Sequence, residues 1–112
     1  MVTEEDMNIA IQITNKIREL LGNKLTKIIL FGSRARGEAN TDSDFDFVIL
    51  AEFAEPSWIV RNSTIRKHVK AADLYNISVD YVPITEWEFE NKFFLKNHVK
   101  REGIILYESH NR

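Results

Sequence analysis

Two acidic residues separated by a single position, Asp44 and Asp46, begin an otherwise apolar segment that ends at Leu50. Because side chains alternate along a β-strand, both carboxylates would lie on one face, opposite Phe45 and Phe47. At a separation of ~5 Å and an effective dielectric constant of ~20, their repulsion is on the order of 3 kcal/mol. Mg²⁺ removes this repulsion and prefers carboxylate oxygen ligands. The pair therefore indicates a metal site; the alternative is a solvated strand end whose acids pair with a nearby Arg or Lys.

A third acid, Asp80, lies in the middle of the alternating segment Ile77–Val82. A charged residue is unusual in such an apolar strand, and it is a natural metal ligand; the alternative is a surface acid on a half-exposed sheet. If this strand lies beside the one that begins at Asp44, the three carboxylates converge. Carboxylates grouped in this way can hold one cation, or two cations about 3.5–4 Å apart.

The segment Gly32–Gly37 precedes these acids and combines a strand end, a permissive glycine and a small hydroxyl, Ser33. It is not a P-loop, because its glycine spacing is one residue short and Glu38 stands where a P-loop has its Lys. Free backbone N–H groups in such a turn nonetheless suit a phosphate, and Arg34 and Arg36 would add positive charge beside it. The alternative is an ordinary glycine-rich turn with solvated arginines.

Periodicity in the first half of the chain predicts the elements that position these residues. Thr3 followed by Asp6 is a variant of the capping box, and Gly22 follows the last helical position. The expected elements are a helix over Glu4–Leu21, a strand over Lys27–Phe31, a turn over Ser33–Glu38 and a strand over Asp44–Leu50.

The second half begins with a helix that Ser57 should cap and that should continue to about Asp73. Its candidate inward-facing side chains are Trp58, Ile65, His68, Val69 and Ala72. Neither His68 nor His98 has the surroundings of a catalytic group, so both histidines are expected to be packed or solvated.

Pro83 should end the strand over Ile77–Val82. The capping box formed by Thr85 and Glu88 should then begin a helix that continues to about Arg101. The remaining segments are Ile104–Tyr107, an edge strand or a packed tail, and Glu108–Arg112, a frayed end. The order of elements predicts an α/β (α+β) fold in which helices pack against a small mixed sheet of three to four strands.

Composition limits the classes of function. The 112 residues suit one domain over 1–112, and the absence of cysteine excludes disulfides, Cys-ligated zinc and a thiol nucleophile. A formal charge of -2 without a basic tail argues against binding of duplex nucleic acid. The acidic start and the short apolar runs argue against a signal peptide and a bilayer span, so we expect a cytoplasmic protein.

The segment Leu30–Gly37, followed by Ser43–Asp46 and a later strand acid, resembles the signature of the minimal nucleotidyltransferases (MNT). These proteins are a branch of the DNA polymerase β-like nucleotidyltransferase superfamily. The helix before the first strand and the ending Glu102–Glu108 are also similar to that branch, so the resemblance covers most of the chain. It implies the polymerase β-like nucleotidyltransferase fold.

The resemblance also implies roles for the residues. Asp44, Asp46 and Asp80 would be the catalytic residues and would hold Mg²⁺, with two ions expected, while ATP serves as the nucleotide donor. Gly32 and Ser33 would contact the β- and γ-phosphates, and Arg34 or Arg36 would help to neutralise them. Pyrophosphate would be the second product.

Members of this branch are commonly encoded with a HEPN-type partner, and the resemblance implies a toxin and antitoxin pair in which AMP is transferred to a tyrosine of the toxin. A hetero-oligomer with that partner is expected. Two alternatives stay open: a non-catalytic antitoxin that blocks its partner sterically, and a transferase for a small molecule such as an aminoglycoside. Five aromatic residues are candidates for a contact surface or for the core: Trp58, Trp87, Phe89, Phe93 and Phe94.

Overall fold

The computed structural model describes residues 1–110, with every side chain in that range except that of Ala72. One mixed sheet has the strand order β3-β2-β1-β4. The two central strands, β1 and β2, are antiparallel, as are β1 and β4, whereas β2 and β3 are parallel. The strands are β1 (Leu25–Phe31), β2 (Phe45–Ala51), β3 (Val79–Ile84) and β4 (Ile104–Glu108). The predicted α/β fold with a small mixed sheet is confirmed.

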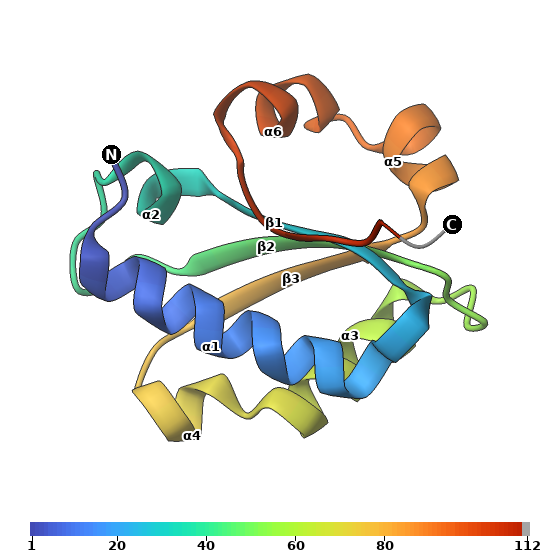
Figure 1. The fold of residues 1–112 in the computed structure, drawn as a ribbon, viewed down its shortest axis with the longest axis horizontal. Helices are drawn as coiled ribbons and strands as arrows, with labels where there is room; N and C mark the ends of the chain where they lie inside the picture. Colours follow the sequence, from blue (N-terminus) through green and yellow to red (C-terminus); the bar gives the residue numbers. More distant parts are fainter. Residues whose placement is uncertain (111–112) are drawn as a thin grey trace.

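Helices cover both faces of this sheet (Figure 1). On the lower face in the figure lie α1 (Glu4–Leu21), α3 (Trp58–Val69) and α4 (Ala71–Tyr75). On the upper face lie α5 (Glu86–Lys92) and α6 (Lys96–Glu102). A 3-10 turn, η1 (Gly22–Lys24), directly precedes β1, and the short α2 (Gly32–Arg36) directly follows it. Within residues 1–110, no helix has the length and apolar character that crossing a membrane requires.

The sheet separates two apolar clusters, and β2 contributes to both. Phe45, Phe47 and Ile49 are buried in the cluster that includes the inner face of α1. Val48 and Leu50 belong to the second cluster, beneath α5 and α6. The predicted alternation along this strand is confirmed, and it explains why β2 is buried on both faces.

The predicted bounds of α1 are confirmed, and its cap differs from the prediction in one respect. Thr3 accepts a hydrogen bond from the backbone N–H of Asp6 at 3.1 Å, as the capping pattern requires. The carboxylate of Asp6, however, accepts from Arg34 rather than turning back to the cap. The shorter Asp side chain thereby joins α1 to α2.

The helix expected from Ser57 to about Asp73 is confirmed as far as Val69 and is wrong beyond it. It ends at Val69 because Lys70 adopts a left-handed conformation (φ 52°), and α4 follows. Ile65 and Val69 are buried as predicted, whereas Trp58 and His68 are exposed. The remaining prediction, for the side chain of Ala72, lies outside the described residues.

The helix expected from Thr85 to Arg101 is likewise two helices, because the chain leaves the helical conformation at Phe93 (ψ 110°) before α6 begins. Its capping box is confirmed, since the Thr85 and Glu88 side chains each accept from the other residue's backbone N–H. Of the aromatic residues, Phe89 is buried and Phe93 is partly buried. Those left exposed are Trp58, Trp87 and Phe94.

The prediction that Pro83 ends its strand is wrong, because β3 continues through it to Ile84. β3 is an edge strand, and the Ser78 carbonyl accepts from the N–H of Phe45 on β2. The backbone N–H and C=O groups at the odd positions of β3 therefore point away from β2, toward the open edge of the sheet. Pro83 therefore lacks an N–H only where no neighbouring strand needs one. At the opposite edge, Ile104–Glu108 is a strand rather than a packed tail. Of the end expected to be frayed, Glu108–Arg112, the first residue belongs to this strand. Residues 111–112 lie outside the described range.

Candidate active site

The three predicted acids lie at one end of the sheet, on neighbouring segments. Phe31, Asp46 and Asp80 form a row across β1, β2 and β3, since Phe31 is the register partner of Asp46 and Asp46 that of Asp80. Asp44 directly precedes β2 on the same side of that strand as Asp46. The parallel pairing of β2 with β3 thus brings together acids that are more than thirty positions apart in the sequence.

Gly32 is the residue after Phe31, at the start of α2, and it packs directly against Asp46. Its φ of +79° lies in the left-handed region, and a Cβ at this position would overlap the Asp46 carboxylate. Glycine is therefore required both by the backbone conformation and by the space available. The expected turn over Ser33–Glu38 overlaps the five-residue α2, which begins one residue earlier, at Gly32. Gly37 ends this helix with a φ of +74°.

The acids form a centre of negative charge that Arg36 and Arg66 offset only in part. Burial, followed by the neighbouring carboxylates of Asp80 and Asp44, raises the pKa of Asp46 from 3.8 to about 6, while Arg36 acts in the opposite direction. Partial burial and the nearby Asp44 carboxylate also raise the pKa of Asp80, against the effect of Arg66. Asp46 and Asp80 are therefore costly to ionise at this site, and a bound cation relieves such a cost.

The donor set fits a hard divalent cation, because Mg²⁺ is held by carboxylate oxygens. Within residues 1–110, no three side chains of His, Cys, Asp or Glu are arranged around one point as metal ligands would be. The Asp80 side chain points partly to solvent and is 63% exposed. Ligation would thus require the carboxylates to rotate toward a shared ion.

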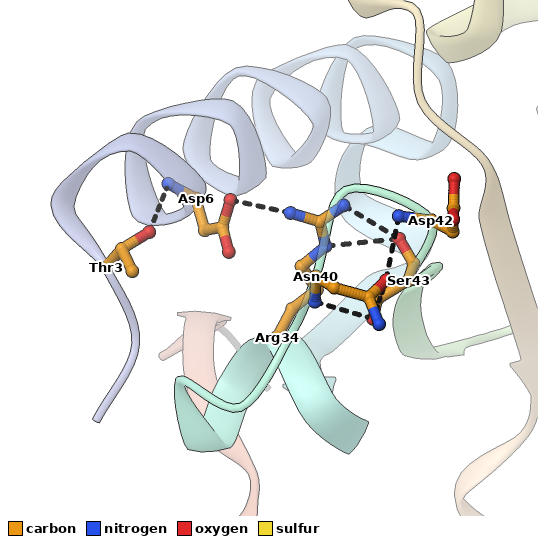
Figure 2. A network of polar contacts seen from close by, with 6 residues as sticks. All are labelled: Thr3, Asp6, Arg34, Asn40, Asp42 and Ser43. Carbon is orange, nitrogen blue, oxygen red and sulfur yellow. Dashed lines mark hydrogen bonds and ion pairs between the residues drawn. The ribbon is translucent and has the colours of Figure 1, made fainter.

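Arg34 is held inside the protein by three groups (Figure 2). Its Nη1 donates to Asp6 Oδ1 at 3.0 Å, and its Nε and Nη2 donate to the Ser43 carbonyl at 3.2 and 2.8 Å. The guanidinium also lies 4.5 Å from the centroid of the Phe45 ring. These contacts tie α1 and α2 to the residue that precedes Asp44, and we call Asp6, Arg34 and Ser43 the arginine clamp.

The loop between α2 and β2 is held further by its own polar groups. Asn40 Oδ1 accepts from the N–H of Asp42 at 2.9 Å, and Ser43 Oγ accepts from the N–H of Asn40 at 3.1 Å. Together with the clamp, these bonds hold the loop that connects α2 to β2 (Figure 2).

The two predicted phosphate-binding arginines thus differ in their surroundings. The side chain of Arg34 is 12% exposed and fully engaged in the clamp, whereas that of Arg36 is 33% exposed and pairs at 3.3 Å with the exposed Glu38. Both phosphate contacts remain predictions, and the geometry favours Arg36 for that role.

Sequence patterns gave no signal for Arg66, which lies beside Asp80. Its Nη2 is 3.8 Å from Asp80 Oδ1 and donates to the Val79 carbonyl at 2.7 Å. Its Nε donates to Asn62 Oδ1 at 2.7 Å. Periodicity places Arg66 on a helix, and a helical position alone does not distinguish an arginine at the site from a solvated one.

Comparisons with known proteins bear on this site. A family model described as "Nucleotidyltransferase domain" matches residues 11–106. Protein adenylyltransferase MntA of Aphanizomenon flos-aquae is 32% identical over 102 residues, which cover 83% of this chain and 67% of that protein.

Two solved structures are similar over most of the chain. A crystal structure of a toxin-antitoxin with AMP-PNP is 28% identical, with a TM-score of 0.61 and coverage of 86% of this chain and 73% of that one. A complex of a tri-AMPylated Shewanella oneidensis HEPN toxin with an MNT antitoxin is 25% identical, with a TM-score of 0.55 and coverage of 90% and 73%.

Proposed function

Because the chain belongs to the nucleotidyltransferase domain family, we propose that it transfers AMP from ATP to a tyrosine hydroxyl of a HEPN-type toxin and so acts as its antitoxin. The observation that carries this proposal is the row of Asp46 and Asp80, with Asp44 beside it, directly against the Gly32 turn. A carboxylate cluster next to a glycine-serine turn is the arrangement that a triphosphate and its cations require. The proposal places the reaction in the cytoplasm, where ATP is abundant.

Asp44, Asp46 and Asp80 would hold two Mg²⁺ ions. When bound, the ions supply positive charge to the triphosphate and lower the pKa of the attacking hydroxyl. Asp44 and Asp46, on one side of β2, would orient the α-phosphate, and Asp80 would face the acceptor. Asp80 would complete the second metal site and so favour deprotonation of that hydroxyl.

The backbone N–H groups of the Gly32 turn and the Ser33 hydroxyl would bind the β- and γ-phosphates, and Arg36 would balance their charge. The acceptor oxygen would attack the α-phosphorus, and the bond from that phosphorus to the bridging oxygen of pyrophosphate would break. The acids lie on or beside neighbouring strands of one sheet, and the Gly32 turn directly follows another strand of it, so catalysis would come chiefly from positioning and charge.

A protein acceptor is supported by the relatives, one of which is named a protein adenylyltransferase while another is bound to an AMPylated HEPN toxin. The exposed aromatic residues Trp58 and Phe94 also leave apolar surface for a partner. We propose a stable complex of this chain with the HEPN-type protein encoded beside it.

The test is transfer of label from ATP to that purified HEPN-type protein in the presence of Mg²⁺. ATP labelled at the α-phosphate should label the toxin, and ATP labelled at the γ-phosphate should not. Replacing both Asp44 and Asp46 with Asn should lower the rate by at least about 100-fold, while Asp42→Asn, an exposed loop change, should leave it unchanged.

The alternatives predict different results. If the double variant still neutralises the toxin as well as the wild type does, the antitoxin acts by steric block. If the label goes to an aminoglycoside and not to the toxin, the protein acceptor is wrong.

A further inference from the structure

A groove of about 1080 Å³ follows the outer edge of β3 between α3 and α5. These two helices lie on opposite faces of the sheet, so the groove wraps around its edge (Figure 1). Apolar side chains line it from α3, from β3 and from the two residues that follow α5: Trp58, Ile59, Val82, Ile84, Phe93 and Phe94. Trp58, Ile59 and Phe94 are 59%, 69% and 89% exposed, which is a large apolar surface for so small a protein.

The groove leads to the proposed catalytic centre. Asp80 lines it at one end and also lines the neighbouring pocket that contains Asp44. From Asp80 to Ile84 the edge of β3 extends for roughly 13 Å. An occupant that reached Asp80 and filled the groove would therefore extend along the strand from Asp80 to Ile84. The volume of the groove lies at the upper limit of small-molecule sites.

The backbone of β3 is not free to pair with an added strand. Its outward carbonyls accept from side chains of α3: Val79 from Arg66 at 2.7 Å, Tyr81 from Asn62 at 2.8 Å and Pro83 from Arg61 at 3.1 Å. Pro83 also has no N–H to donate. The occupant must therefore bind through side-chain packing, which is the way in which an amphipathic helix fills a groove.

The charged side chains in the groove indicate which residue types should flank the apolar residues of that helix. Arg61 pairs with Glu88 at 2.7 Å, and Arg66 lies 3.8 Å from Asp80, so these four charges are matched within the protein. Lys67 and Lys92 also line the groove, and neither has a carboxylate partner among residues 1–110. Two unmatched lysines beside an apolar surface complement Asp or Glu on an occupant.

We propose that this groove docks an apolar helix, flanked by acidic residues, of the protein that accepts AMP, and so brings the accepting hydroxyl to Asp80. The inference rests on the proposed function, because it assumes a protein acceptor. In this proposal, α3, β3 and α5 select the partner, and the acids and the Gly32 turn carry out the chemistry.

The experiment measures binding and AMP transfer with the HEPN-type protein encoded beside this chain. Trp58→Ala and Phe94→Ala should each weaken the dissociation constant and raise the KM for that protein by about 10-fold or more. Lys67→Glu should slow association, chiefly at low salt. The KM for ATP and the kcat at saturating partner should not change.

Matched controls lie away from the groove. Ile105→Ala removes an exposed apolar side chain from β4, at the opposite edge of the sheet, and Lys24→Glu reverses an exposed charge in η1. Neither control should alter binding. Because Trp58 and Phe94 are largely exposed, their truncation should leave the unfolding temperature near that of the wild type.

A photo-crosslinking residue in place of Phe94 identifies the occupant. Mass spectrometry should locate the crosslink on a helix of the partner that carries Asp or Glu. A crosslink to a basic segment, to a strand or to a second copy of this chain would overturn the proposal. Unchanged binding by both truncation variants would overturn it as well.

The two proposals fail in distinguishable ways. If the wild type transfers no AMP but the variants still lose binding, the proposed function is wrong and the groove stands. If the wild type transfers AMP and the variants do so with the same KM for the partner, only the groove is wrong.

Discussion

At the scale of single residues, the site depends on residues whose placement lowers the stability of the folded protein. Asp46 is half-buried between Asp44 and Asp80, and Gly32 is constrained both by its φ of +79° and by contact with Asp46. Such local costs are typical of sites that hold a charged ligand, because the ligand relieves the strain or repulsion that the fold retains. Two predictions follow from the size of these costs.

The first concerns the stability of the metal-free protein as pH changes. Burial and neighbouring carboxylates raise the pKa of Asp46 from 3.8 to about 6, so the folded protein binds more protons than the unfolded chain between these values. Stability should therefore fall as pH rises through this window and remain low above it. Asp46→Asn should raise the free energy of unfolding at about pH 8 by about 1 kcal/mol, a value reduced for solvent screening, and should have no such effect below the window.

Urea denaturation without metal, at several pH values, measures this difference. Asp42→Asn is the control and should change stability by no more than about 0.5 kcal/mol at any pH. An Asp46→Asn variant that is less stable than the wild type at about pH 8 would show that the carboxylate is stabilised by a partner rather than strained.

The second residue-scale prediction separates two reasons for glycine at position 32. Gly22 also has a left-handed φ, of +54°, but a Cβ there meets nothing within 4 Å. Gly22→Ala should therefore cost about 1–3 kcal/mol of stability, from backbone strain alone, and leave AMP transfer intact. Gly32→Ala should cost more and abolish transfer, since its Cβ displaces Asp46. Equal activity of the two variants, at matched folded fractions, would contradict the packing of Gly32 against that acid.

At the scale of elements, the sequence patterns located the strands and their faces well. Alternation in Asp44–Leu50 and the Thr85–Glu88 capping box were sufficient, because both depend on residues close in the chain. The breaks at Lys70 and Phe93 were missed, since a lysine in the left-handed region has no local signature. Arg61 and Arg66 were missed because their partners lie on β3 and α5, and pairing between distant elements cannot be inferred from periodicity.

The arginine clamp leads to a prediction at this scale, because it joins α1, α2 and the loop before β2. The side chains of Arg34 and Asp6 are 12% and 10% exposed, so removing one partner leaves a nearly buried charge. Asp6→Asn should therefore destabilise the protein by about 2–3 kcal/mol. Glu108→Gln, which removes the exposed pair with Lys27, should cost less than about 1 kcal/mol.

Thermal unfolding measures both variants, and kinetics identifies the role of Arg34. If Arg34 is a clamp residue, Arg34→Lys should lower stability and kcat together and change the KM for ATP little. A stable Arg34→Lys variant whose main defect is a raised KM for ATP would instead place the guanidinium on the phosphates.

At the scale of the whole molecule, the sheet gathers the acids at one end and leaves an apolar groove along one edge. The strand order explains this arrangement, because β2 is central and carries Asp46 while β3, at the edge, carries Asp80. The same order places Asp80 where the groove and the acid cluster meet. A platform of this kind supplies charge and position, and in the proposed function the acceptor would come from another protein.

The most direct test of this account is the intact mass of the HEPN-type partner after it is produced in cells together with this chain. With the wild type, the partner should carry one or more AMP groups on tyrosine. With Asp44 and Asp46 both replaced by Asn, it should be bound but unmodified, and Asp42→Asn should behave as the wild type. A partner that remains unmodified with the wild type, or is equally AMPylated with the double variant, would contradict catalysis by these acids.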